Sequence, residues 1–219
     1  MDLCLVGSEM CIRDRIMSSN TKQHWETVYE TKTPEQVSWT QEIPETSLNF
    51  INSFQLSKEA KIIDIGGVDS HLVDFLLEQG YTNITVLDIS KKALQRAKER
   101  LGKKANLITW IVSDVLDFIP DTPYDIWHNR AAFHFLTSKS QIDTYISLTQ
   151  KFVSRNLIIG AFSDNGPLKC SGLEITQYSK NKMSEAFNEG FEPIKCIRET
   201  HKTPFNTVQD FVFCSFKKQ

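Results

Sequence analysis

Apolar and polar positions alternate in blocks along most of the chain. Short runs rich in Ile and Val are separated by longer stretches in which apolar residues recur at helical spacing. The runs predicted as strands cover residues 60–65, 83–88, 106–114, 124–128 and 156–162. The stretches predicted as helices cover residues 21–32, 45–54, 71–79, 91–101 and 140–152. Strand–helix alternation with short turns predicts a parallel sheet with right-handed crossovers.

The helix boundaries also carry capping signals. Asp69 or Ser70 is a suitable N-cap for the third helix, which should stop at Gly80. Ser90 should cap the fourth helix, whose Ala93, Leu94, Ala97 and Leu101 share one face.

The last third of the chain follows a different pattern. A loop at 163–179 leads into a predicted helix at 180–190, and two extended runs follow at 191–200 and 208–216. Because no helix separates these two runs, they should pair as antiparallel neighbours at one edge of the sheet. The sequence therefore predicts an α/β fold: a Rossmann-like three-layer sandwich with a seven-stranded, mostly parallel sheet and a C-terminal antiparallel strand pair.

The first residues, MDLCLVGSEMCIRDRI, do not fit this pattern. Their apolar core is too short for a signal peptide, and Asp2 stands where positive charge would be expected. The stretch resembles translated sequencing-adaptor sequence, and Met17 is a plausible start. We expect residues 1–16 to be a non-native or disordered extension and residues 17–219 to form a single domain.

Composition limits the possible functions. The chain has a formal charge of −2 and a pI near 6.2, which argues against non-specific binding to nucleic acid or a membrane surface. No apolar run reaches the roughly 20 residues of a membrane span. The cysteines are scattered without C-x-x-C spacing, so we expect neither a zinc site nor a disulfide framework, and we predict a cytoplasmic location. They are Cys4, Cys11, Cys170, Cys196 and Cys214.

Three aspartates stand at or near the ends of predicted strands: Asp64, Asp88 and Asp114. In open α/β sheets, ligands bind at the carboxyl ends of the strands. Gly66 and Gly67 allow a tight turn and a close approach of the backbone to a ligand. A carboxylate at position 88 could accept both hydroxyls of a ribose, so these residues predict a nucleotide pocket.

The turn after the first strand indicates which nucleotide is held. A dinucleotide site prefers G-x-G-x-x-G, which brings backbone N–H groups onto a pyrophosphate. This chain instead has GGVDSH, with the acid Asp69 where phosphate charge would lie. A carboxylate repels a pyrophosphate and attracts a sulfonium cation, so the turn favours S-adenosylmethionine over NAD.

The motifs IIDIGGVDS, VLDIS and SDVLDF, with the closing strand pair, resemble class I S-adenosylmethionine-dependent methyltransferases. HWETVYETKTPEQVSWTQ and WHNRAAFHFLT are similar to a group of small bacterial methyltransferases. That group is itself similar to eukaryotic lysine methyltransferases and, more distantly, to thiopurine methyltransferases. The usual turn has a third glycine where this chain has Val68, and the group often has Asp where Asn129 stands.

The resemblance implies S-adenosyl-L-methionine as cofactor and assigns residues to its parts. Asp64, Gly66 and Gly67 would line the methionine portion, and Asp88 would hold the ribose. Asp114 would accept a hydrogen bond from the adenine amino group, with Ile89 and Val115 against the ring. The aromatic residues that would cover the cofactor from the N-terminal side are Trp25, Tyr29 and Trp39.

His128 and Arg130 follow the fourth predicted strand, where methyltransferases present the acceptor, and they are the catalytic candidates. His128 could act as a general base, or it could hydrogen-bond inside the protein without chemistry. Arg130 could bind an acidic acceptor or the cofactor carboxylate, or could pair with Asp69 or Asp125. Cys170 and His201 are second candidates in acceptor-side loops.

The function predicted is methyl transfer from S-adenosylmethionine to a small molecule or a protein lysine. Two alternatives remain open at this point. One is a catalytically silent S-adenosylmethionine-binding regulatory module, and the other is an NAD-dependent oxidoreductase. We expect a monomer or homodimer that binds neither nucleic acid nor a membrane, and no metal site.

Overall fold

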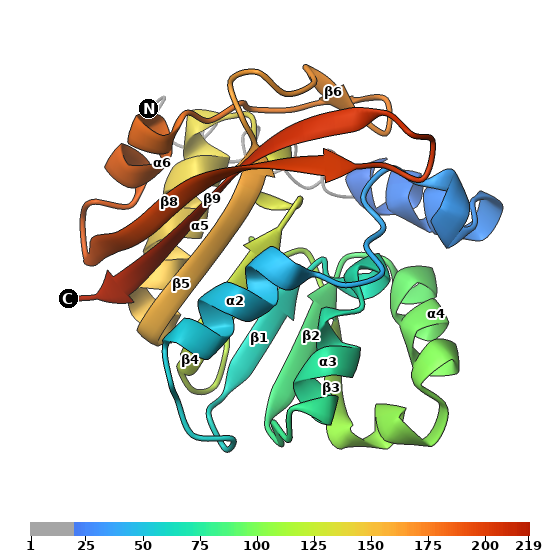
Figure 1. Ribbon diagram of the computed structural model, residues 1–219, viewed down its shortest axis with the longest axis horizontal. Coiled ribbons are helices and arrows are strands. Elements are labelled where there is room, and N and C mark those ends of the chain that lie inside the picture. Colours follow the sequence, from blue (N-terminus) through green and yellow to red (C-terminus); the bar gives the residue numbers. More distant parts are fainter. Residues whose placement is uncertain (1–19) are drawn as a thin grey trace, which may run out of the picture.

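The computed structural model describes residues 20–219, so the predicted extension at residues 1–16 lies outside the described residues. A seven-stranded sheet with the strand order β3-β2-β1-β4-β5-β9-β8 forms the centre of the fold (Figure 1). Its strands are β1 (Ile62–Ile65), β2 (Ile84–Asp88), β3 (Ile108–Val112), β4 (Tyr124–Arg130), β5 (Val153–Phe162), β8 (Phe191–Lys202) and β9 (Val208–Lys218). This architecture confirms the predicted fold class.

The direction of the strands also follows the prediction. Strands β1 to β5 run parallel to one another, and β9 is antiparallel to both of its neighbours, β5 and β8. The order reverses at β1, because the chain moves outward to β2 and β3 and then returns to β4 on the other side. Such a switch point leaves a crevice at the carboxyl ends of the strands.

Helices cover both faces of the sheet. Their bounds are α2 (Glu45–Ser53), α3 (Leu72–Glu78), α4 (Lys91–Leu101), α5 (Lys139–Phe152) and α6 (Lys180–Ala186). Helices α2, α3 and α4 contribute to one buried cluster, and α5 and α6 contribute to the cluster on the opposite face. Residues 20–31 are also helical and lie near the tip of the β8–β9 hairpin (Figure 1). No helix within residues 20–219 has the length and hydrophobicity to cross a membrane.

The capping prediction holds at α4 and fails at α3. At α4 the Ser90 hydroxyl accepts a hydrogen bond from the backbone N–H of Ala93, as predicted. At α3 a short 3-10 turn, η2 (Val68–Ser70), comes first, and the helix starts only after His71. His71 has a left-handed backbone with φ of 56° and takes the N-cap position in place of Asp69 or Ser70. The Ser70 hydroxyl still accepts from the backbone N–H of Leu72, at 3.5 Å.

Three further short 3-10 turns are η1 (Pro34–Gln36), η3 (Gly102–Leu107) and η4 (Phe133–Phe135). The predicted loop at 163–179 contains a small antiparallel pair, β6 (Lys169–Cys170) and β7 (Leu173–Glu174). The β8–β9 hairpin contacts the segment after η1, because His201 Nε2 donates to the Ser38 carbonyl at 2.7 Å. This contact brings the last two strands against the N-terminal segment.

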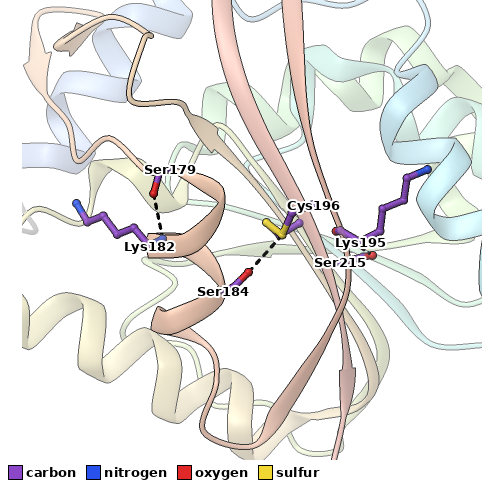
Figure 2. The surroundings of a disulfide bond; sticks show 7 residues. Ser179, Lys182, Ser184, Lys195, Cys196 and Ser215 are labelled. Atoms are coloured by element: carbon purple, nitrogen blue, oxygen red, sulfur yellow. Dashed lines mark hydrogen bonds between the residues drawn. A yellow bond between two sulfur atoms is a disulfide. The ribbon is translucent and has the colours of Figure 1, made fainter.

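The structure corrects the expectation that the cysteines form no disulfide. Cys196 in β8 and Cys214 in β9 are direct cross-strand partners and are joined by a disulfide (Figure 2). Their separation of 18 positions gave no spacing signal, because the pairing arises from the register of the hairpin. Cys170, by contrast, is a buried free thiol.

Candidate functional site

A cavity of about 520 Å³ opens at the carboxyl ends of the central strands. Its walls include Gly66 after β1, Asp88 at the end of β2, Asp114 after β3 and Arg130 at the end of β4. This volume is in the range of small-molecule sites. All of the predicted cofactor-binding residues except Asp64 and Gly67 line the cavity.

The glycine turn after β1 is shaped by the carboxylate beneath it. Gly66 has φ of +69° and lines the cavity, so a glycine at this position avoids backbone strain. A Cβ atom on Gly67 would lie 1.7 Å from Oδ2 of Asp64, so any side chain there would collide with the buried carboxylate. Asp64 and Gly67 therefore support the floor of the turn and do not form its surface.

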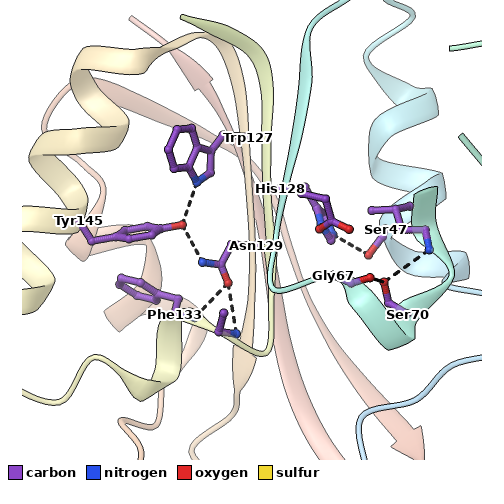
Figure 3. Close-up of polar contacts among 11 residues, drawn as sticks. Ser47, Gly67, Ser70, Trp127, His128, Asn129, Phe133 and Tyr145 are labelled. Carbon is purple, nitrogen blue, oxygen red and sulfur yellow. Dashed lines mark hydrogen bonds and ion pairs between the residues drawn. The ribbon is translucent and has the colours of Figure 1, made fainter. Parts of the chain in front are cut away.

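Asp64 is fully buried and belongs to a chain of hydrogen bonds with His128 and Ser47. Nδ1 of His128 lies 2.7 Å from Oδ1 of Asp64, and Nε2 lies 2.8 Å from the Ser47 hydroxyl (Figure 3). With its proton on Nδ1, the imidazole donates to Oδ1 of Asp64 and its Nε2 accepts from the Ser47 hydroxyl. Among residues 20–219, Oδ2 of Asp64 is buried without a hydrogen-bond partner. His128 is not part of the cavity wall.

This arrangement argues against the predicted role of His128 as a general base. A general base must reach the proton that it removes. Both ring nitrogens of His128 are occupied by Asp64 and Ser47, and the side chain is 0 % exposed. The alternative interpretation, an internal hydrogen-bonding role, fits the structure.

Asn129 points to the opposite side of β4, toward α5. Its side-chain N–H donates to the Tyr145 hydroxyl at 2.8 Å, and its oxygen accepts from the backbone of Ala132 and Phe133 (Figure 3). The Tyr145 hydroxyl also accepts from Trp127 Nε1 at 3.0 Å. Asn129 thus fixes the turn after β4 from within the core.

Asp88 is the most strongly perturbed acid of the cavity wall. Its side chain is buried, and Oδ1 accepts from the backbone N–H of Ser90 at 2.8 Å. Burial raises the pKa of Asp88 to about 7, and the nearby charges of Asp69, Glu26 and Asp64 act in the same direction. Carboxyl groups therefore gather at this end of the cavity, where Ile89, Asp114 and Val115 continue the wall.

The aromatic residues predicted to cover the cofactor form one group of neighbouring rings, which we call the aromatic cover. The rings of Trp25, Tyr29 and Trp39 lie with centroid distances of 5.7 to 6.4 Å, and all three line the cavity. Phe135 adds a further ring 5.1 Å from Trp25. These contacts place the N-terminal helix across the mouth of the crevice.

Glu26 anchors this aromatic cover, and the sequence analysis did not identify it. Its carboxylate accepts from the backbone N–H groups of Lys91 and Lys92 at 2.8 and 3.2 Å and from the Ser90 hydroxyl at 3.0 Å. An acid is favoured at a helix N-terminus, but this helix start lies more than 60 positions away in the sequence. No local pattern could have indicated the contact.

Arg130 enters the cavity wall at the end of β4. Its Nη1 donates to the Trp39 carbonyl at 2.8 Å, and its guanidinium carbon lies 5.1 Å from the centre of the Phe211 ring. Burial lowers the pKa of Arg130 to about 10, so the group stays charged. The predicted pairing with Asp69 or Asp125 is wrong, because these acids pair with Arg96 and Arg155.

The second candidates occupy different places. Cys170 lines the cavity, and burial raises the pKa of its thiol to about 12. His201 does not line it, and its Nε2 is bound to Ser38. Two cavity-wall residues not identified by the sequence analysis are Phe162 and Phe211, whose apolar character gave no sign beyond strand burial.

Comparison with known families and proteins is consistent with this geometry. Residues 62–152 match the family described as a methyltransferase domain. The chain is 28% identical over 210 residues to the EEF1A lysine methyltransferase 2 of Mus musculus. The aligned region covers 88% of this chain and 82% of that protein.

Solved structures share the fold. A S-adenosylmethionine-dependent methyltransferase from Anabaena variabilis superposes with a TM-score of 0.70 at 14% identity, over 93% of this chain and 95% of that one. The N-methyltransferase NodS from Bradyrhizobium japonicum, in complex with S-adenosyl-L-homocysteine, gives a TM-score of 0.61 at 17% identity over 81% and 89% of the two chains.

Proposed function

We propose that the protein is a class I, S-adenosylmethionine-dependent methyltransferase, because residues 62–152 match a methyltransferase domain and the chain shares the fold of such enzymes. We also propose that its cavity has two parts with different ligands. The part of the cavity over β1, β2 and β3 holds the cofactor. The part at the ends of β4, β5 and β9 holds a methyl acceptor, which is a small molecule or a protein lysine.

The cavity wall fits this cofactor in charge and in shape. The carboxylate of Asp88 can accept the ribose hydroxyls, and Ile89 and Val115 offer apolar surface for the adenine. Asp88 and Asp114 place carboxyl groups in the cavity wall, and Asp69, Glu26 and Asp64 lie near enough to act on Asp88 from behind the wall. An acidic environment of this kind attracts a sulfonium cation and repels a pyrophosphate. The carboxyl groups at this end of the cavity are the observation that carries the proposal.

The bound cofactor supplies a methyl group already activated on a sulfonium. The residues of this chain need to align the acceptor and keep water out, since positioning accounts for most of the rate gain in such a transfer. Trp25, Tyr29 and Trp39 provide the cover, and Gly66 leaves room for close approach. Arg130 is the charged group beside the acceptor part.

We further propose that the protein works in the cytoplasm as a monomer or homodimer. In a reducing cytoplasm the Cys196–Cys214 pair would be held as two thiols. Alkylation of the thiols in freshly lysed cells, followed by mass spectrometry, distinguishes the two states.

Calorimetric titration with S-adenosyl-L-homocysteine tests the cofactor site. We expect saturable binding by the wild type and a loss of at least about ten-fold in affinity for Asp88→Asn, because two charge-assisted hydrogen bonds are weakened. Asp143→Asn, in the exposed part of α5, is the matched control and should bind as the wild type does. Equal binding by Asp88→Asn, or tighter binding of NAD, would contradict the proposal.

Transfer of labelled methyl groups into a fractionated lysate tests the acceptor. Label in low-mass fractions indicates a small molecule, and label in protein fractions indicates a lysine acceptor. Cofactor binding without transfer into any fraction would indicate a catalytically silent module.

A further inference from the structure

The cavity extends well beyond the part proposed for the cofactor. Strand order places β9 five strand spacings from β3, roughly 24 Å across the sheet, and residues of both ends line one cavity. We call the end formed by Arg130, Phe135, Phe162, Cys170 and Phe211 the far chamber. Phe162 and Phe211 are cross-strand partners in β5 and β9, with ring centroids 4.7 Å apart.

Arg130 brings a buried and incompletely paired cation into this chamber. The residue is 5 % exposed, and its Nη1 is taken by the Trp39 carbonyl. Its Nε and Nη2 atoms are buried and have no hydrogen-bond partner in the described part of the chain, residues 20–219. These two atoms form one edge of the planar guanidinium, and this is an edge to which a carboxylate binds through two parallel N–H···O bonds.

Within residues 20–219, no carboxylate forms an ion pair with this edge. The arginines that form ion pairs between residues 20 and 219 are Arg96, Arg100, Arg155 and Arg198. Glu199 and Asp64 are the acids that most support the charge of Arg130, but neither forms an ion pair with it. An oxygen of Glu199 accepts from Gln41, and Asp64 is bound to His128.

An unpaired buried charge is costly, so a ligand group that pairs with it is bound favourably. The rest of the far chamber is aromatic, with Phe135, Phe162 and Phe211 in its wall. Cys170 adds a thiol that stays neutral, because burial raises its pKa to about 12. A lysine ammonium would meet repulsion from Arg130 in this chamber.

We infer that the far chamber binds a small-molecule acceptor with a flat apolar body and a carboxylate, which is held by the Nε and Nη2 edge of Arg130. The inference rests on the proposed function and selects the small molecule over the protein lysine. The carboxylate anchors the acceptor, and the aromatic rings hold its body beside the cofactor part of the cavity.

The test uses protein saturated with S-adenosyl-L-homocysteine and three probes of similar shape: benzoate, benzamide and benzylammonium. Their binding is followed by ligand-observed NMR. Benzoate should bind at least about ten-fold more tightly than benzamide, since charge-assisted hydrogen bonds exceed neutral ones, and benzylammonium should bind weakest.

Variants assign the preference to the arginine edge. Arg130→Met should bring the benzoate-to-benzamide ratio to about one, and Arg130→Lys should keep only part of it, because an ammonium lacks the planar edge. Arg155→Met, on the surface away from the cavity, is the matched control and should keep the full preference. Each variant is first shown to fold by its thermal transition.

Several outcomes would overturn the inference. These are equal binding of benzoate and benzamide by the wild type, an unchanged preference in Arg130→Met, or displacement of S-adenosyl-L-homocysteine by benzoate. A further one is that Arg130→Met weakens the binding of S-adenosyl-L-homocysteine but leaves the binding of 5′-methylthioadenosine unchanged. Arg130 would then hold the carboxylate of the cofactor. Failure of the wild type to bind S-adenosyl-L-homocysteine at all would instead reject the proposed function, and the inference with it.

Discussion

Nδ1 of His128 lies 2.7 Å from the carboxylate of Asp64, and the two residues are register partners on the parallel strands β4 and β1. Their side chains therefore project from the same face of the sheet. Since Asp64 also lies directly below Gly67, the pair supports the turn that borders the cavity from beneath. The histidine contributes to structure, and the turn depends on it.

His128→Ala should consequently destabilise the protein. The substitution leaves the Asp64 carboxylate buried without its partner, which costs about 3 kcal/mol in free energy of unfolding. Urea denaturation measures the loss, and Ser47→Ala, which removes only the outer partner, should cost about 1 kcal/mol. A normally stable His128→Ala protein that has lost one limb of its pH–rate profile would restore the general-base hypothesis.

The raised pKa of Asp88 predicts a dependence of stability on pH. Between its ordinary pKa of 3.8 and its value of about 7 in the folded protein, the folded state binds a proton that the unfolded state releases. The free energy of unfolding contributed by this group therefore falls as pH rises through that window and is level above it. Asp88→Asn should flatten the profile between these pH values, as thermal unfolding across pH would show.

Cofactor affinity should change in the opposite direction. In the proposed cofactor site the ionised form of Asp88 is the one that would accept the ribose hydroxyls, so S-adenosyl-L-homocysteine should bind more tightly as pH rises through about 7. Titration calorimetry at several pH values checks this, with Asp88→Asn as the insensitive comparison. An affinity that is constant from pH 6 to 8 in the wild type would contradict the assigned role.

Glu26 should control how firmly the aromatic cover is held. Burial opposes ionisation of Glu26, but hydrogen bonds from the backbone of Lys91 and Lys92 and from Ser90 prevail, and its pKa lies below its usual value. Glu26→Ala should cost about 1 kcal/mol and speed hydrogen exchange in residues 20–31, because the start of α4 loses an acceptor.

Glu30→Ala is the matched control for this change. Glu30 lies one turn further along the same helix, and its contact with Lys92 is an exposed ion pair. Its removal should leave the exchange pattern unchanged. Equal exchange in both variants would show that the aromatic contacts alone hold the cover.

The Cys196–Cys214 disulfide should stabilise the oxidised protein. The bond closes a loop of 18 positions, for which the chain-entropy estimate is about 3 kcal/mol. A reductant should therefore lower the melting temperature of the wild type. The double variant Cys196→Ala, Cys214→Ala should melt at the same temperature with and without reductant, and an equal response of both proteins would disprove the bond.

The fold could be predicted from the sequence because each strand and helix is indicated by residues that are neighbours in the sequence. Buried strands such as Ile62–Ile65 are short, branched and apolar, and Ser90 is an ordinary helix cap. The positions of Asp88 and Asp114 at strand ends followed from the same alternation. The absence of a helix between the last two extended runs was enough to predict their antiparallel pairing.

The parts of the site that were not predicted depend on contacts distant in the sequence. The partners of His128 are 64 and 81 positions away, and the direction in which a β4 side chain points is set by register with β1. The contact of Glu26 with the start of α4 and the Cys196–Cys214 disulfide likewise join residues that lie on different elements of the fold. Phe162 and Phe211 fell only within predicted strands, because an apolar side chain gives the same sequence pattern in a core and in a pocket wall.

The placement of β9 between β5 and β8 has a consequence for biosynthesis. Phe211, one wall of the far chamber, lies on the last strand of the chain. A nascent polypeptide that has emerged only as far as α6 already contains β1 to β5. The ends of β1, β2 and β3 border the part of the cavity that we propose for the cofactor. The far chamber, where we propose that the acceptor binds, can therefore be completed only after β9 has been synthesised, later than the strands of the proposed cofactor part.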